Sequence, residues 1–254
     1  MVNTVTPLFT TLRFIERAAA YLQGKGYGSS TINREVKVCS QQLLSTPLLA
    51  VDIGGNVGNY SKRLRKLFNN LEIHIFEPSI TNVEKLNKLF GSDTKISIIP
   101  MALSDNSSTS TLYSNEPGGG LGSLVDRRLT HFGLKLDYTE EVRVIRFENY
   151  WSDVLKERPI DIAKLDIEGF ELNALRGFGR ALHKTRVIQF EFGGCNIDSK
   201  TTFQDFFYFF KDEGFSLYRI APIGIELLDR YREADEYYLT TNFIAVNNKI
   251  GLPR

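Results

Sequence analysis

The chain has 254 residues and a net charge of +1, from 31 Lys and Arg against 30 Asp and Glu. This balance argues against a protein that binds nucleic acid mainly through phosphates, because such binding needs a basic face. The two cysteines, Cys39 and Cys195, are too few for a disulfide framework and form no CxxC pair, so we expect reduced thiols. No apolar run approaches the roughly 18 residues of a membrane span, and no signal peptide is visible. We therefore expect a cytoplasmic protein without a transmembrane segment.

Residues 1–46 are predicted to form a helical extension. Helical spacing of apolar residues in its first half indicates one helix, carried by Leu8, Leu12, Ile15, Ala19 and Leu22. A second helix is expected from a cap at Ser30 to about Leu44, before Pro47. Two interpretations stay open: a lid packed on the core, or an arm for a homodimer or another partner.

Residues 47–250 are predicted to form one α/β domain. Apolar runs indicate strands at 48–53, 71–77, 95–99, 161–166, 186–192, 215–220 and 241–247. Helical segments at 58–69, 81–90, from about 169, and 201–213 separate most of these strands. This alternation is typical of a mostly parallel sheet with helices on both faces.

Residues 106–148 interrupt this alternation. Residues 109–113 and 142–146 alternate like exposed strands and are expected to form an antiparallel pair. A flexible Gly-rich loop, residues 117–123, lies between them. Because loops of this length in compact domains are usually functional or disordered, we expect a β-hairpin and loop inserted over the site.

The first strand of the domain leads into a Gly-rich turn, Asp52-Ile53-Gly54-Gly55-Asn56-Val57-Gly58. The turn lacks the GxGxxG spacing of a dinucleotide site, and an acid precedes its first Gly. An acid in that place suits a ligand with an amino group, such as S-adenosylmethionine. Glu77 ends the next strand and would accept hydrogen bonds from a ribose. The alternative is that the glycines serve only a tight strand-to-helix turn.

Later strands supply the other candidates. Met101 and Ala102 follow the third strand and would border an adenine. Asp166 and Glu168 follow the fourth strand, where two carboxylates could hold a divalent metal such as Mg²⁺, act as general base, or hold the sulfonium end of the cofactor. Glu171 fits an acidic helix N-terminus better.

Four further residues could lie near the site. His131 follows the Gly-rich loop and could reach over the site as a base, or anchor the loop. For Glu191, at the end of the fifth strand, a site role and a structural role are equally well supported. Cys195 and His74 are interpreted as buried core residues.

Taken in order, several motifs resemble the FkbM-family methyltransferases. They are Asp52 to Gly58, Phe76-Glu77-Pro78, Ala102-Leu103-Ser104-Asp105 and Leu165-Asp166-Ile167-Glu168-Gly169-Phe170-Glu171, with Gly120 to Leu124, Arg128 and His131 to Gly133 matching a subgroup. The resemblance covers about residues 48–247. It implies a Rossmann-like class I S-adenosylmethionine-dependent methyltransferase, with a seven-stranded sheet whose last strand is antiparallel.

The resemblance also assigns residues. Cofactor contacts fall on Asp52, Gly54, Gly55, Asn56, Gly58, Tyr60, Glu77, Pro78, Met101, Ala102 and Asp166. Family members mostly methylate hydroxyl oxygens of macrolides or of sugars in glycolipids and polysaccharides. Many carry His where this chain has Phe170, so a His at that position cannot serve catalysis here.

These observations predict O-methylation of a small-molecule, sugar, glycolipid, polysaccharide or polyketide-type hydroxyl. The candidate bases are Asp166, Glu168 and His131, in that order. Two other functions stay open. One is a cofactor-binding but non-catalytic partner subunit. The other is an NAD-dependent oxidoreductase, which the missing GxGxxG disfavours.

Overall fold

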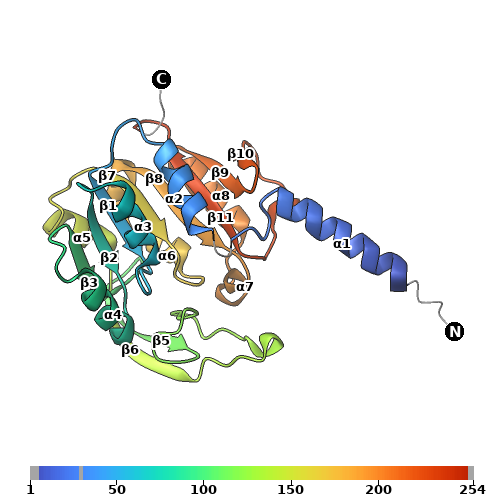
Figure 1. The fold of residues 1–254 in the computed structure, drawn as a ribbon, viewed down its shortest axis with the longest axis horizontal. Helices are drawn as coiled ribbons and strands as arrows, with labels where there is room; N and C mark the ends of the chain where they lie inside the picture. The colour runs from blue at the N-terminus through green and yellow to red at the C-terminus, as the bar shows by residue number, and fades with distance from the viewer. Residues whose placement is uncertain (1–5, 29–30, 251–254) are drawn as a thin grey trace.

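A mostly parallel β-sheet forms the centre of the protein (Figure 1). The computed structural model describes residues 6–28 and 31–250. The strands lie in the order β10-β9-β11-β8-β7-β1-β2-β3, and β11 runs antiparallel to both of its neighbours. Their bounds are β1 Leu49–Ile53, β2 Glu72–Phe76, β3 Ile96–Ile99, β7 Ile160–Leu165, β8 Thr185–Phe192, β9 Phe215–Ala221, β10 Gly224–Leu228 and β11 Thr241–Asn247. All seven predicted strands form, and the edge strand β10 is an eighth that was not predicted.

Helices cover both faces of the sheet, as predicted. One face packs against α2, α3 and α4, and the other against α5, α6 and α8. The bounds are α2 Ile32–Gln41, α3 Asn59–Leu67, α4 Ile80–Phe90, α5 Phe147–Asp153, α6 Glu171–Gly177, α7 Cys195–Ser199 and α8 Phe203–Asp212. Four phenylalanines of α8 are core residues, namely Phe203, Phe206, Phe207 and Phe210. Phe206 stacks on Phe190 of β8, with ring centroids 5.0 Å apart. The short helices α5 and α7 were not predicted.

The insertion contains the expected antiparallel pair. β5 (Ser108–Ser114) pairs with β6 (Tyr138–Ile145), and the two-residue β4 (Ala102–Leu103) adds to β6 in a separate three-stranded sheet. In the fold this sheet lies at the same end as α4 (Figure 1). The division into an extension and a domain at residue 47 stays a prediction.

The two helices of the N-terminal extension behave differently. Val36, Val38 and Cys39 of α2 are buried against the sheet. In contrast, α1 (Thr6–Leu22) points away from the body, and Ala20 is its one buried residue among those described (Figure 1). The prediction of a packed lid therefore holds for α2 and is wrong for α1. The proposed cap Ser30 lies outside the described residues. Across residues 6–28 and 31–250, no helix combines the length and apolar character that a membrane crossing requires.

Candidate active site

A cavity of about 250 Å³ opens at the carboxyl ends of the central parallel strands. Ten of the predicted site residues line it: Gly54, Gly55, Asn56, Tyr60, Glu77, Pro78, Met101, Ala102, Asp166 and Glu168. The inserted loop also lines it, through Gly118 to Gly120, Gly122 and Leu124. Asp52, Gly58 and His131 do not line it. The cavity therefore lies where strand order reverses between β1 and β7, a usual ligand position in open α/β sheets.

The Gly-rich turn keeps the backbone at the cavity floor close-packed. Gly54 has φ +80°, and a Cβ there would lie 2.0 Å from the carbonyl oxygen of Asp166. A Cβ on Gly55 would lie 2.1 Å from Cγ2 of Ile75. Gly58 also has a positive φ but packs against Phe90 of α4. The first two glycines thus shape the cavity, whereas Gly58 serves helix packing.

Glu77 fastens the turn from the next strand. Its Oε2 accepts from the Asn56 N–H at 2.7 Å, and its Oε1 accepts from the Ser79 N–H at 3.0 Å. Burial raises the pKa of this carboxyl, although those two N–H donors oppose the rise. Each oxygen keeps a free lone pair, so Glu77 can still accept from a ligand hydroxyl.

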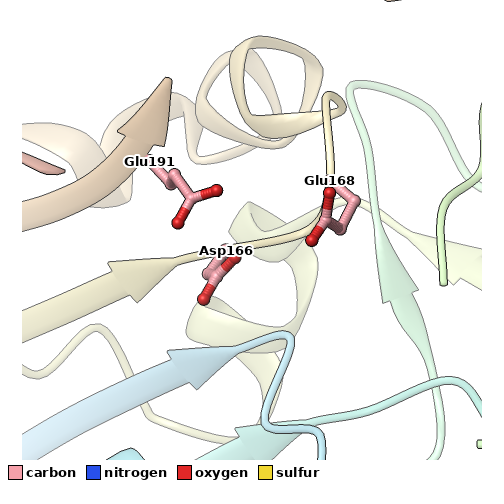
Figure 2. Close-up of side chains that lie close together, drawn as sticks. All are labelled: Asp166, Glu168 and Glu191. Carbon is pink, nitrogen blue, oxygen red and sulfur yellow. The ribbon is translucent and has the colours of Figure 1, made fainter. Parts of the chain in front are cut away.

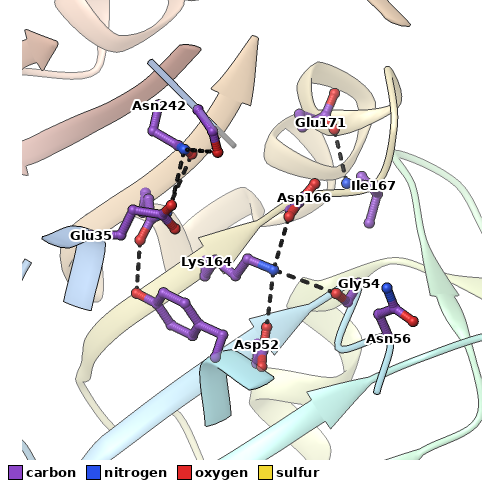
Figure 3. A network of polar contacts seen from close by, with 12 residues as sticks. Glu35, Asp52, Gly54, Asn56, Lys164, Asp166, Ile167, Glu171 and Asn242 are labelled. Atoms are coloured by element: carbon purple, nitrogen blue, oxygen red, sulfur yellow. Dashed lines mark hydrogen bonds and ion pairs between the residues drawn. The ribbon is translucent and has the colours of Figure 1, made fainter. Parts of the chain in front are cut away.

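Lys164 bridges two carboxylates at the floor of the cavity (Figure 3). Lys164 Nζ lies 3.2 Å from Asp166 Oδ2 and 3.7 Å from Asp52 Oδ1. Asp52 is 0% exposed and accepts from the Ser61 hydroxyl at 2.6 Å. Burial disfavours the charged form of Lys164, but the nearby carboxylates, Asp166 first, raise its pKa overall. Asp52 therefore acts on the cavity through Lys164 and the turn, not by facing the ligand space.

Three carboxylates meet on the other side of the cavity (Figure 2). Oxygens of Asp166, Glu168 and Glu191 all lie within 4.8 Å of one another. Burial, and then the charge of Asp166, raises the pKa of Glu168 to about 7, while Arg127 opposes the rise. Burial and the charges of Asp166 and Glu168 likewise hold the pKa of Glu191 well above its usual range. Such a group can share a proton or hold a divalent cation through carboxylate oxygens.

The backbone around Glu168 is held from two sides. Glu168 has φ +56°, a conformation that L-residues rarely adopt and that is concentrated at functional sites. From the inserted loop, Arg127 pairs with the Glu168 carboxylate, and the Ser123 hydroxyl donates to its carbonyl oxygen at 2.8 Å. From α6, the fully buried Glu171 accepts from the N–H groups of Ile167 and Gly169. Glu171 therefore positions this turn without lining the cavity.

A polar wall of the cavity comes from α2 and was not predicted. Glu35 accepts from the Thr31 hydroxyl at 2.5 Å, from Gln189 Nε2 at 2.6 Å and from Asn242 Nδ2 at 3.1 Å (Figure 3). The Tyr60 hydroxyl donates to Gln189 Oε1 at 2.8 Å. Burial raises the pKa of Glu35. One sequence signal existed: Gln189 is a polar residue inside an otherwise apolar strand and needs buried partners.

The remaining candidates lie outside this arrangement. His131 lies in a short 3-10 helix, η1 (Thr130–Phe132), where its side chain is exposed beside Phe132. Cys195 is buried, and burial raises the pKa of its thiol. Phe170 lines the cavity at the position where many family members carry His.

Fold and cavity together define a Rossmann-like α/β protein with a nucleoside-sized site at the strand ends. Residues 52–217 match the model of the "Methyltransferase FkbM domain". The chain therefore belongs to the FkbM methyltransferase family, as its motifs predicted, and has the class I methyltransferase fold.

The chain is similar, at low identity, to solved structures of methyltransferases. Over 80% of the chain, it is similar to 44% of Methyltransferase FkbM from Methylobacillus flagellatus KT, with 17% identity and a TM-score of 0.49. It is similar to SMU.1697c, a putative methyltransferase from Streptococcus mutans in complex with SAH (11% identity, TM-score 0.48, covering 86% of this chain and 98% of that one). The chain spans less than half of the Methylobacillus protein. No curated protein gave a significant match. Membership of the family is therefore shown by the match over residues 52–217.

Proposed function

We propose that this protein binds S-adenosylmethionine in the cavity and methylates a hydroxyl oxygen of a sugar, glycolipid, polysaccharide or polyketide-type acceptor. The observation that carries the proposal is the juxtaposition of two features. A Gly-rich turn with an acid on the next strand faces a cluster of three carboxylates across one cavity. The first suits a nucleoside ligand, and the second suits removal of a proton.

The residues present fit the cofactor. Close packing of Gly54 and Gly55 against Asp166 and Ile75 holds the backbone of the turn at the cavity, which both glycines line. Glu77 would accept from the ribose hydroxyls, with Pro78, Met101 and Ala102 bordering the adenine. Asn56, Tyr60 and Asp166 would face the methionine part, supported from below by Asp52 and, through helix packing, by Gly58.

When bound, the cofactor supplies an electrophilic methyl group on a sulfonium. The protein's task is to orient the acceptor oxygen in line with that methyl, exclude water and accept the hydroxyl proton. Glu168 is best suited to accept the proton, because its pKa of about 7 lies near neutral pH. Asp166 is the alternative base; Lys164 pairs with it at 3.2 Å, as Arg127 pairs with Glu168. His131, the third candidate, would need a displacement of η1 to reach the acceptor.

A second version places a divalent cation on Asp166, Glu168 and Glu191. The cation would lower the pKa of the acceptor hydroxyl. Treatment with EDTA distinguishes the two versions. Undiminished activity would exclude a metal requirement, whereas a loss of activity that Mg²⁺ restores would support the cation.

Two measurements test the proposal against its alternatives. Calorimetry with S-adenosylmethionine and NAD should show binding of the first alone; the reverse result would make the protein an oxidoreductase. Single-turnover transfer of labelled methyl to a glycan or lipid extract should then label a product. Binding without transfer would favour a non-catalytic subunit. Mass spectrometry of metabolites from a deletion strain would identify the acceptor by the loss of one methyl group.

A further inference from the structure

Half of the 20 large hydrophobic side chains that are exposed among the described residues lie on two segments. Seven are on α1, and three are on or just before β10: Leu8, Phe9, Leu12, Phe14, Ile15, Tyr21, Leu22, Ile223, Ile225 and Leu227. Contiguous exposed apolar surface of this kind usually marks an interaction site. Both segments lie outside the family match over residues 52–217: α1 precedes it and β10 follows it.

The apolar residues of α1 follow the spacing of a packing seam. Leu8, Leu12, Ile15, Ala19 and Leu22 are separated by four, three, four and three residues, which places them on one stripe of the helix. Each of these five side chains is exposed. Most of the stability of helices in proteins comes from packing of an apolar face, so a stripe of this kind on the 17-residue α1 indicates that another surface covers it.

The β10 surface is a sheet face without a helix. Ile225 and Leu227 alternate along the strand, so they point to one side, with 36% and 53% exposure, and Ile223, in the turn just before the strand, is 83% exposed. Ile225 lies opposite Ile220 of β9, which packs in the cluster that α2 covers. The exposed residues therefore extend the α2-covered face of the sheet to its edge, and among the described residues no helix covers that edge.

The linker sets α1 beside this face but directs it away. A Cβ on Gly24 would lie 2.4 Å from the carbonyl oxygen of Ile220, so the segment directly after α1 touches the end of β9. Lys25 Nζ donates to the Ala234 carbonyl at 2.6 Å and holds this segment in place. From there α1 leads outward (Figure 1). Within the described part of the chain, the β10 face thus stays uncovered, and α1 is available to a neighbour.

We propose that two copies of this chain form a two-fold dimer in which α1 of each copy lies on the β10 face of the other. Such an interface is self-complementary, because each copy gives one helix and one sheet face. Pairing of α1 with α1 alone would use a single helix face about 25 Å long, at 1.5 Å per residue. Specific interfaces bury roughly 800 Å² per partner, which calls for both surfaces.

Charge on α1 favours a protein partner over a lipid surface. Its charged residues are Arg13, Glu16 and Arg17, so the acid offsets one of the two cations. Helices that bind anionic membranes carry a polar face rich in Lys and Arg.

The dimer also has a consequence for the cavity. The segment that follows α1 supplies Gly28, Thr31 and Glu35 to the cavity lining, so the partner would steady that wall.

Sedimentation equilibrium of the full chain tests the dimer. We expect twice the 28.9 kDa chain mass at micromolar concentration. Leu12→Glu and, separately, Leu227→Glu should each raise the dimer dissociation constant at least 100-fold. Thr10→Glu, on the opposite side of α1, is the matched control and should leave it unchanged. Circular dichroism and thermal melting confirm that each variant folds.

Cysteine cross-linking tests the exchange of helices. Chains carrying Leu12→Cys, Ile15→Cys or Ala19→Cys are each mixed with chains carrying Leu227→Cys, and mild oxidation should give mixed disulfides. The native Cys39 and Cys195 are buried and should not react. A wild-type chain that sediments as a monomer, or disulfides that form only between α1 positions, would overturn the proposal. So would a monomer that co-sediments with phosphatidylserine vesicles.

Discussion

The two ends of the cavity are built in different ways. At the end formed by β1 and β2, Glu77 holds the turn at Gly54 and Gly55 by accepting a hydrogen bond from the Asn56 N–H. Glu77 lies only 21 residues after Asn56 in the chain. At the other end, Glu168 meets Glu191 of β8 and Arg127 of the insertion. The first end is one strand-turn-helix unit and its neighbour, whereas the second joins segments far apart in the chain. Substitutions should therefore separate binding at one end from chemistry at the other.

The largest expected effect is at the carboxylate end. Glu168→Gln keeps the shape of the side chain but removes its ability to accept a proton. General-base catalysis typically contributes about 10²–10⁴-fold, so the rate of methyl transfer should fall by at least about 100-fold. The dissociation constant for S-adenosylmethionine, measured by calorimetry, should stay within about threefold.

Glu140→Gln provides a control for Glu168→Gln, because Glu140 also lines the cavity but bonds to the Ser79 hydroxyl at 2.7 Å. It should retain most of the transfer rate. Equal losses in the two variants would show that the cavity responds to any loss of negative charge, and Glu168 would no longer be the base.

A second test disturbs the contact between the two ends. Gly54→Ala places a Cβ 2.0 Å from the Asp166 carbonyl oxygen, so β1 and β7 must separate locally. A displacement of about 1 Å can cost about 100-fold, and we expect cofactor affinity to fall by that order. Gly214→Ala is the matched control: φ is +82° there, but a Cβ meets nothing within 4 Å. Its stability should fall by only roughly 1–2 kcal/mol, the cost of a left-handed backbone in a residue with a Cβ, and it should bind cofactor normally.

If Gly54→Ala and Gly214→Ala behave alike, backbone conformation rather than close packing would explain the glycine at 54. Calorimetry for the cofactor and chemical denaturation for stability separate these outcomes. The comparison thus tests whether the turn is shaped by its neighbours or only by its own geometry.

A smaller effect is expected at the ribose position. Glu77→Gln exchanges a charged acceptor for a neutral one, and hydrogen bonds to charged groups contribute about 1.5–3 kcal/mol. We expect cofactor affinity to fall roughly tenfold, equivalent to about 1.4 kcal/mol. Glu72→Gln, at the other end of β2, should leave cofactor affinity unchanged. A normal affinity for Glu77→Gln would remove Glu77 from the ribose site.

The contrast between the ends also explains what could be predicted from the sequence. Strand periodicity and the Gly-rich turn are local features, so the sheet, its helices and the Glu77 end were predictable. The α2 wall was not, because Glu35 looks like any polar residue in a first helical turn until Gln189 and Asn242 fold against it. The exposed place of His131 and the outward course of α1 likewise depend on tertiary packing that no local pattern records.

The smallest expected effect concerns that α2 wall and is a pH dependence of stability. Burial raises the pKa of Glu35 above its unfolded value of 4.5. The folded state therefore binds the proton more tightly, so this contribution to stability is complete below pH 4.5 and is lost as pH rises through the folded pKa. Glu35→Gln cannot titrate. Relative to wild type, its free energy of unfolding should thus improve between pH 4.5 and pH 7.5, as measured by urea denaturation at both values.

The free energies of unfolding of variant and wild type must be subtracted at each pH, because other buried acids, such as Glu77, change stability in the same direction. Since Thr31, Gln189 and Asn242 surround Glu35, the substitution also loses hydrogen bonds at every pH, and only the pH-dependent part reports the titration. A difference between variant and wild type that does not change with pH would mean that Glu35 is equally protonated in both states. In that case the pKa of Glu35 would not be raised by folding, and at pH 7.5 the wall would hold an ionised carboxylate through its hydrogen bonds from Thr31, Gln189 and Asn242.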